Sequence, residues 1–195
     1  MTLTAHVHSR SDSRRNHEAV LVAALDLFLD EGLEAPLEAV ARRADVGVGT
    51  IYRHFGHRYG LQRALMLEAS RRSAALARVA LAEEAGPHDA LVRYSQSVVT
   101  GGWAAIVPAL QGLVDLDGDE ELAAAAHDAL AAVAELVDAA HGDATLARDV
   151  TAGDLGLVLA RLGRPLGGRL ADDATRELML RHLAIFLRTA LRRPA

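Results

Sequence analysis

A seven-residue segment, Gly-Thr-Ile-Tyr-Arg-His-Phe at 49–55, most narrows what this chain can fold into. The apolar side chains of Ile51 and Phe55 stand four residues apart. Side chains at that spacing lie on one face of an α-helix, so both are expected to be buried. The segment therefore predicts a short amphipathic helix with a polar face. The polar side chains expected to point the other way are those of Thr50, Arg53 and His54.

A second short helix is predicted just upstream. Residues 37–44 have helical character, and Pro36 suits a helix entry because the N–H that it lacks would have no partner there. The three residues Asp45, Val46 and Gly47 then form a turn of the kind found in helix-turn-helix units. In this interpretation the segment 49–55 lies in the second helix, whose polar side chains suit phosphates and base edges.

The rest of the chain also has a helical pattern. Apolar residues between 16 and 30 follow the i, i+3, i+4, i+7, i+8 stripe of an amphipathic helix, and no segment alternates like a β-strand. The sequence therefore predicts an all-α fold, with an N-terminal three-helix helix-turn-helix domain followed by a C-terminal helical bundle. The predicted parts are a flexible N-terminal arm at 1–15, the helix-turn-helix domain at 16–56 and the bundle at 57–195.

The charge balance does not by itself favour binding to nucleic acid. The formal net charge is −5, and residues 1–60 hold seven Arg against eight acidic residues. Four of the acids, Asp26, Asp30, Glu31 and Glu34, cluster near the end of the first predicted helix, whereas the arginines flank the helix-turn-helix motif. A local basic face is therefore compatible with the total charge.

Two features bear on the compartment. The chain has no cysteine, and its start lacks an apolar signal core, so we expect a cytoplasmic protein without an export signal. Residues 94–114 carry no charge, but they contain Gly101, Gly102 and Pro108 together with several polar side chains. We therefore expect a broken, buried helical segment there and no membrane span.

Several short sequence motifs occur together between Ala19 and Leu61. They are Ala-Ala-x-x-Leu-Phe at 23–28, Glu-Gly at 31–32, Val-Ala at 40–41, Val46 and the segment 49–55. In this order and spacing they resemble the DNA-binding domain of the TetR family of bacterial transcription regulators. The resemblance implies a homodimer whose C-terminal domain binds a small molecule and so weakens binding to an operator.

The resemblance also implies roles for individual residues. Tyr52, His54 and Arg58 would contact the DNA backbone, and Thr50 would contact a phosphate or a base. Independently of the family, an arginine such as Arg53 can form a forked pair of hydrogen bonds with guanine, which makes it the main candidate for base specificity. The predicted DNA-binding residues are Gly47, Val48, Gly49, Thr50, Tyr52, Arg53, His54 and Arg58.

The uncharged run 94–114 is the first candidate for a small-molecule pocket, because such pockets are mainly apolar with a few oriented polar groups. The sequence does not identify the effector. The alternative that these residues simply fill a core stays open. The predicted ligand-binding residues are Met66, Tyr94, Gln96, Trp103 and Gln111.

The last two predicted helices, 151–162 and 173–192, have wider apolar surfaces than one core-facing stripe needs. They are therefore expected to form the homodimer interface. Two symmetric recognition helices would read a near-palindromic operator with half-sites about 34–36 Å apart, or a multiple of that distance.

Other function classes receive less support. No metal-ligand spacing, phosphate-binding glycine loop or nucleophile motif occurs, so we expect no metal, no cofactor and no enzymatic activity. The remaining alternative is a helical interaction or scaffold protein with a degenerate DNA-binding unit. The net acidity supports that alternative. Two departures from the TetR pattern also support it, namely Pro36-Leu37 where the family often has Thr-Thr, and Gly47 where it commonly has Ser in the turn.

Overall fold

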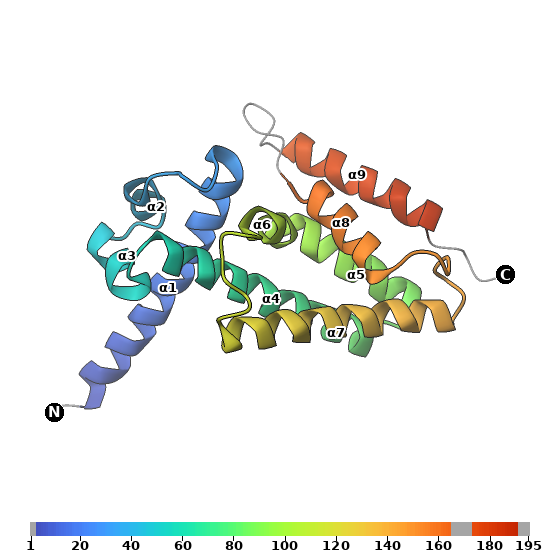
Figure 1. Ribbon diagram of the computed structural model, residues 1–195, viewed down its shortest axis with the longest axis horizontal. Helices are drawn as coiled ribbons and strands as arrows, with labels where there is room; N and C mark the ends of the chain where they lie inside the picture. The colour runs from blue at the N-terminus through green and yellow to red at the C-terminus, as the bar shows by residue number, and fades with distance from the viewer. Residues whose placement is uncertain (1–2, 165–172, 191–195) are drawn as a thin grey trace. The chain divides into compact units, whose positions relative to one another are not determined.

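The computed structural model describes residues 3–164 and 173–190 (Figure 1). These residues form α-helices and no β-strand, which confirms the predicted all-α fold. The helices are α1 Leu3–Glu31, α2 Leu37–Arg43, α3 Val48–Phe55, α4 Arg58–Glu83, α5 Pro87–Thr100, α6 Trp103–Leu110, α7 Glu120–Gly142, α8 Ala152–Leu162 and α9 Asp173–Ala190.

The chain divides into two compact units, residues 1–65 and residues 66–195. The smaller unit holds α1, α2, α3 and the first turns of α4, and the larger unit holds the rest of α4 and the helices that follow. The boundary predicted from the sequence lies after residue 56. The structure moves it into α4, because Leu61 and Leu65 are fully buried and belong to the smaller unit.

Helix α1 begins earlier than the sequence analysis predicts. It starts at Leu3, so residues 3–15 are helical, whereas a flexible arm was predicted over 1–15. The sequence is consistent with this longer helix, since neither glycine nor proline occurs before Gly32 to interrupt it. Near this end Arg15 lies 3.5 Å from Asp12, an ion pair one helical turn apart.

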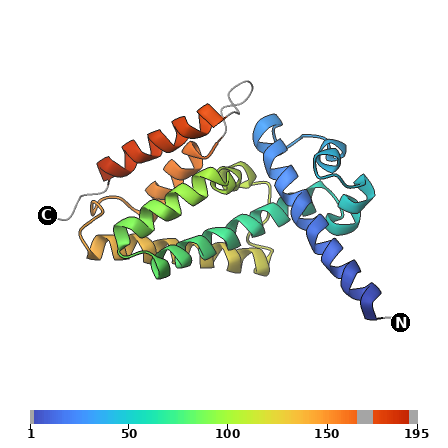
Figure 2. The ribbon, with the colours of Figure 1, turned by 180° about the vertical axis from the view of Figure 1, so that it is seen from behind.

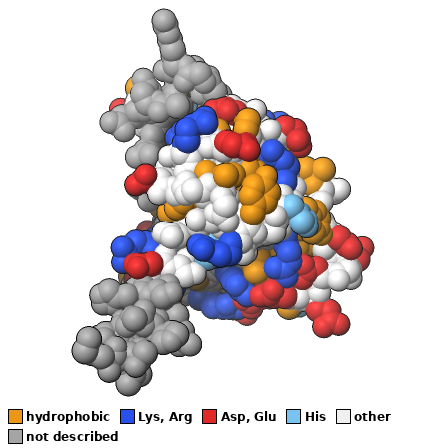
Figure 3. All heavy atoms as spheres, turned by 90° about the vertical axis from the view of Figure 1, so that its left-hand side faces the viewer, with side chains coloured by type: hydrophobic (Ala, Val, Ile, Leu, Met, Phe, Trp, Pro, Cys, Tyr) orange, Lys and Arg blue, Asp and Glu red, His pale blue; other side chains and the backbone are white. Residues whose placement is uncertain are grey.

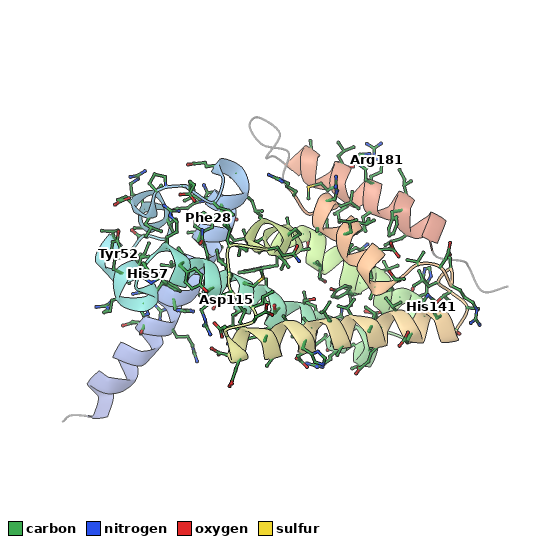
Figure 4. All side chains as sticks on the ribbon, in the orientation of Figure 1. Phe28, Tyr52, His57, Asp115, His141 and Arg181 are labelled. Atoms are coloured by element: carbon green, nitrogen blue, oxygen red, sulfur yellow. The ribbon has the colours of Figure 1, made fainter. Side chains whose placement is uncertain are left out.

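The core of the smaller unit forms where α1, α2 and α3 pack against one another. The apolar stripe predicted for α1 is buried as expected, at Val20, Ala23, Ala24, Leu27 and Phe28. Figure 4 shows Phe28 among the helices of this unit, whereas Tyr52 projects away from them. The core thus supports α3 on one side and leaves the other side of this helix uncovered.

In the larger unit, α5 packs against α6, α7, α8 and α9. Figures 1 and 2 show α7 along one edge of the bundle and α9 along the opposite edge, with α5 and α8 between them. Alanines 74, 77 and 80 of α4 join Leu91, Leu136 and Leu159 in one buried cluster.

Polar side chains define the starts of two of these helices. The carboxylate of Asp119 accepts a hydrogen bond from the Leu122 amide at the start of α7. At the start of α8, Thr151 and Asp154 form a reciprocal capping box, and the hydrogen bonds from Thr151 lower the pKa of Asp154. Both caps satisfy amide N–H groups that have no partner inside the helix.

Candidate functional site

The turn between α2 and α3 depends on an aspartate. Asp45 has φ 54°, the left-handed conformation, and its amide donates to the Arg42 carbonyl at 3.3 Å. The Val46 amide donates to the Ala41 carbonyl at 3.0 Å, which completes a Schellman motif. Gly47, which the sequence analysis placed in this turn, has φ −71° and serves as the N-cap of α3. The conformational freedom of glycine is therefore not what makes this turn.

Asp45 should tolerate replacement by glycine and should not tolerate a β-branched residue. In the left-handed region an ordinary side chain is disfavoured by about 1–2 kcal/mol, whereas glycine and, to a lesser extent, aspartate adopt it readily. We expect Asp45→Gly to leave the free energy of unfolding nearly unchanged or to raise it, and Asp45→Val to lower it by about 1–2 kcal/mol. Chemical unfolding followed by circular dichroism measures both. Equal stability of the two variants would show that the turn carries no such constraint.

Helix α3 has the two-sided character that the sequence predicts. Ile51 is fully buried and Phe55 nearly so, which confirms their shared inward face. Tyr52 is 50% exposed, and Arg53 is also exposed, as are Gly47 and Gly49. The two remaining predicted contact residues of the first turn, Val48 and Thr50, are half-buried. The side of α3 that faces away from the core thus exposes the phenol of Tyr52 and the guanidinium of Arg53.

The orientation predicted for His54 is wrong. Its side chain is half-buried, and its Nε2 atom is buried without a hydrogen-bond partner. The ring lies edge-on to His17 of α1, with 6.0 Å between ring centroids, and His17 in turn stacks on Phe55 at 4.8 Å. The reason is helical geometry, because His54 follows Ile51 by three residues and so borders the buried face.

Arg58, at the start of α4, is engaged inside the smaller unit. Its Nη1 donates to the carbonyl of Leu33 at 2.7 Å and to that of Ala35 at 2.9 Å. Its Nε also lies 4.0 Å from a carboxylate oxygen of Glu34. These acceptors belong to the connection between α1 and α2. In this conformation Arg58 ties that connection to α4, and the predicted phosphate contact stays a prediction.

Charges of both signs are interspersed on the face seen in Figure 3. In the smaller unit Arg43 lies 3.6 Å from Asp26, which offsets part of its charge. Burial raises the pKa of Asp26, and Arg43 partly opposes that shift. Arg42 and Arg53 are exposed. A basic surface around α3 therefore depends on a few arginines and not on a broad positive field.

The larger unit contains a cavity of about 460 Å³. It lies within the range of about 300–1,000 Å³ that is usual for small-molecule sites. Four of the predicted ligand-binding residues line it, namely Met66, Tyr94, Trp103 and Gln111. Ligand binding by these residues stays a prediction.

Gln96 was predicted to line the pocket, and this prediction is wrong. It does not line the cavity and its side chain is exposed. It follows Tyr94 by two residues, which places it on nearly the opposite side of α5. An uncharged run on a helix therefore includes residues that face away from the pocket, and helical position decides between them.

The polar groups of the cavity come mainly from α4. Ser73 and Tyr94 place their hydroxyl oxygens 2.9 Å apart, and either can be the donor. Burial raises the pKa of Tyr94, so the phenol stays protonated at neutral pH. The guanidinium carbon of Arg72 lies 4.6 Å from the centre of the Trp103 ring, and its Nε donates to Glu68 at 2.5 Å. Neither Ser73 nor Arg72 was predicted from the sequence to line a pocket, and both lie outside the uncharged run 94–114.

Comparison with known proteins decides the family. Residues 20–65 match the family model described as bacterial regulatory proteins, tetR family. A TetR transcription regulatory protein from Mycobacterium vanbaalenii shares 32% identity over 94% of this chain and 99% of its own, with a TM-score of 0.63. The chain belongs to the TetR family.

Two further TetR-family structures are similar over nearly their whole length. A transcriptional regulator from Streptomyces coelicolor has 25% identity, covers 91% of this chain and 99% of its own, and has a TM-score of 0.64. The regulator PfmR from Thermus thermophilus, at 19% identity, shares the fold, with coverage of 89% and 99% and a TM-score of 0.60. Among curated proteins, none matches this sequence. As a TetR-family protein, the chain is a DNA-binding transcriptional regulator.

The two helices predicted to form the dimer of this TetR-family protein each have a buried and an exposed side. Leu155 and Leu159 of α8 and Leu183 of α9 lie in the core. Leu157 of α8 is 58% exposed and Ile185 of α9 is 46% exposed. Both helices therefore keep apolar surface outside the core. Residues 191 and 192 of the predicted range lie outside the described residues.

The structure also bears on metals and membranes for the part of the chain that it describes. Within residues 3–164 and 173–190, His, Asp and Glu side chains form no group of three that could hold a metal ion. No helix among these residues is both long and apolar enough to cross a membrane.

Proposed function

We propose that this TetR-family protein is a ligand-responsive repressor. In this proposal a homodimer binds a near-palindromic operator through α3, and a small molecule in the cavity of the larger unit releases it. The observation that carries the proposal is the two-sided character of α3. Buried Ile51 and Phe55 anchor this helix, while Tyr52 and Arg53 extend from its open side, where a duplex groove can receive them.

The proposed DNA contacts follow from this geometry. The hydroxyl of Tyr52 donates to a phosphate oxygen, and Arg53 reads a base edge in the major groove. Gly49 is exposed, and beyond its chain neighbours and the backbone of α3 no atom lies within 4 Å of the Cβ that another residue would have there, so the backbone of α3 can come close to DNA. The further proposed contacts are those of Gly47, Val48 and Thr50, with His54 and Arg58 joining once their side chains rearrange.

The proposed coupling uses α4. This helix contributes to both units: Arg58 and Leu61 belong to the smaller one, and Met66, Ser73 and Leu76 line the cavity of the larger one. A ligand that contacts this lining changes the set of conformations that α4 adopts. It shifts the dimer away from the DNA-bound form only if it binds the released form more tightly.

For the dimer we propose the exposed sides of α8 and α9. Their apolar side chains that remain outside the core, Leu157 and Ile185 among them, are the kind that a two-fold interface buries. Analytical ultracentrifugation of the purified protein tests this. A dimer that Leu157→Asp and Ile185→Asp convert to monomer supports the proposal. A protein that is monomeric at micromolar concentration contradicts it.

Binding to duplexes selected from a random pool tests the DNA-binding step. If each dimer forms two to four arginine–phosphate pairs, affinity should fall about ten- to a hundredfold between 50 and 200 mM salt. Fluorescence anisotropy of a labelled duplex measures this. Failure to enrich any duplex, or an affinity that does not change with salt, would favour the alternative of a helical interaction protein.

A further inference from the structure

The polar and apolar groups around the cavity restrict what it can bind. We propose that it takes an uncharged, largely apolar molecule with one hydroxyl or carbonyl oxygen, and that the hydroxyl pair of Ser73 and Tyr94 holds this oxygen. This inference rests on the proposed function in assigning a ligand to the cavity, and it adds the chemical class of that ligand.

The walls of the cavity are mostly aliphatic. Val98, Val107, Leu116 and Val133 from successive parts of the larger unit line it, together with several alanines. Burial of apolar ligand surface against such walls is favourable by a free energy of about 25 cal/mol per Å². A strongly hydrated group would lose its water there without gaining hydrogen bonds in return. The body of the ligand must therefore be apolar.

The charges around the cavity exclude a cation. No carboxylate belongs to the described residues that line it, so a bound ammonium group would lose its hydration without gaining an opposite charge. Arg72 is a charged side chain of the lining, and Glu68 offsets its charge at 2.5 Å. Arg72 also covers one side of the Trp103 ring. A carboxylate therefore gains less here than it would beside an unpaired arginine.

The hydroxyl pair supplies the specific contact. Tyr94 is 5% exposed, and its oxygen lies 2.9 Å from that of Ser73. Two hydroxyls that share one hydrogen bond still hold a second O–H that the pair itself does not use. That O–H can donate to a hydroxyl or carbonyl oxygen of the ligand, and the remaining lone pairs can accept from a ligand hydroxyl.

Intrinsic tryptophan fluorescence can measure ligand binding to this cavity. Trp103 is the only tryptophan in the sequence and it lines the cavity, so its fluorescence responds to an occupant. Titration at neutral pH with 1-decanol, decanoate and decylamine, each kept below its aggregation concentration, compares three head groups on one chain. Cyclododecanol and cyclododecylamine repeat the comparison in a compact shape. We expect the alcohols to bind best, decanoate less well, and the amines at least about tenfold more weakly than the matched alcohols.

Substitution of the hydroxyl pair gives the second arm. Tyr94→Phe and Ser73→Ala should each weaken binding of the alcohols about three- to tenfold, the usual effect of losing one hydrogen bond. The matched control is Gln96→Ala, which lies on the same helix as Tyr94, is exposed and should bind the alcohols like the unmodified protein. Thermal unfolding of each variant shows whether the fold is intact.

Several results would overturn the inference. They are amines that bind as tightly as alcohols, a Tyr94→Phe variant that is intact and retains full affinity for them, or no change of Trp103 emission with any member of either series. Operator affinity measured on the same preparations separates the two proposals. Intact DNA binding with no binding of the series refutes the ligand class alone. Alcohols that bind in the expected order without changing operator affinity refute the coupling alone.

Discussion

Replacing Arg53 by alanine is expected to relax base preference at one position of each half-site. The side chain is exposed on α3, and a forked pair of hydrogen bonds to guanine discriminates against other bases by about 1–3 kcal/mol. At that position the preference should therefore fall about five- to 150-fold, while the other positions keep theirs. Selection of bound duplexes from a random pool, with the unmodified protein alongside, measures preference position by position.

Tyr52→Phe is the matched comparison for Arg53→Ala. It removes one hydroxyl from a side chain that is 50% exposed on the same helix. Because a phosphate contact carries no base information, this variant should weaken all duplexes by a similar factor and leave the selected sequence unchanged. If Tyr52→Phe changes the sequence preference while Arg53→Ala weakens binding uniformly, the two roles assigned here are reversed.

Replacing Arg58 by alanine is expected to destabilise the smaller unit even in the absence of DNA. The substitution removes both hydrogen bonds from Nη1 and leaves the carbonyls of Leu33 and Ala35 without this donor. Hydrogen bonds to a charged group contribute about 1.5–3 kcal/mol each. Since the Arg58 side chain is 29% exposed and water can replace part of the loss, we expect the free energy of unfolding to fall by about 2–4 kcal/mol. Urea unfolding of the DNA-free protein measures this.

Two further variants separate a structural role of Arg58 from a phosphate contact. Arg58→Lys keeps the positive charge but lacks the planar guanidinium, so it should recover only part of the stability. Arg42→Ala removes an exposed arginine from the same unit and should change stability by less than about 0.5 kcal/mol. An Arg58→Ala variant that unfolds like the unmodified protein and loses only DNA affinity would contradict the structural role.

Much of the fold follows from local patterns that a sequence displays directly. The apolar stripe of α1 and the pair Ile51 and Phe55 are buried as their spacing predicts. The length of α1 was underestimated, because Leu3, Ala5 and Val7 are the apolar residues among 3–15 and they do not extend the apolar stripe to residue 16. A helix without an apolar face gives weak periodicity, and only the lack of glycine and proline points to it.

The sequence by itself determined the helical architecture, because helix formation and burial depend on neighbours three and four positions away. The order and spacing of short motifs indicated the family, and four of the five residues predicted for a pocket line the cavity. The tertiary structure alone decided which distant groups meet. Arg58 reaches carbonyls 23 and 25 positions away, and Tyr94 reaches the hydroxyl of Ser73 at a separation of 21. Such pairs leave no periodic signal, since they depend on how whole helices pack. For His54 the half-buried position follows from its spacing of three residues from Ile51, whereas its ring contact with His17 of another helix depends on the tertiary structure.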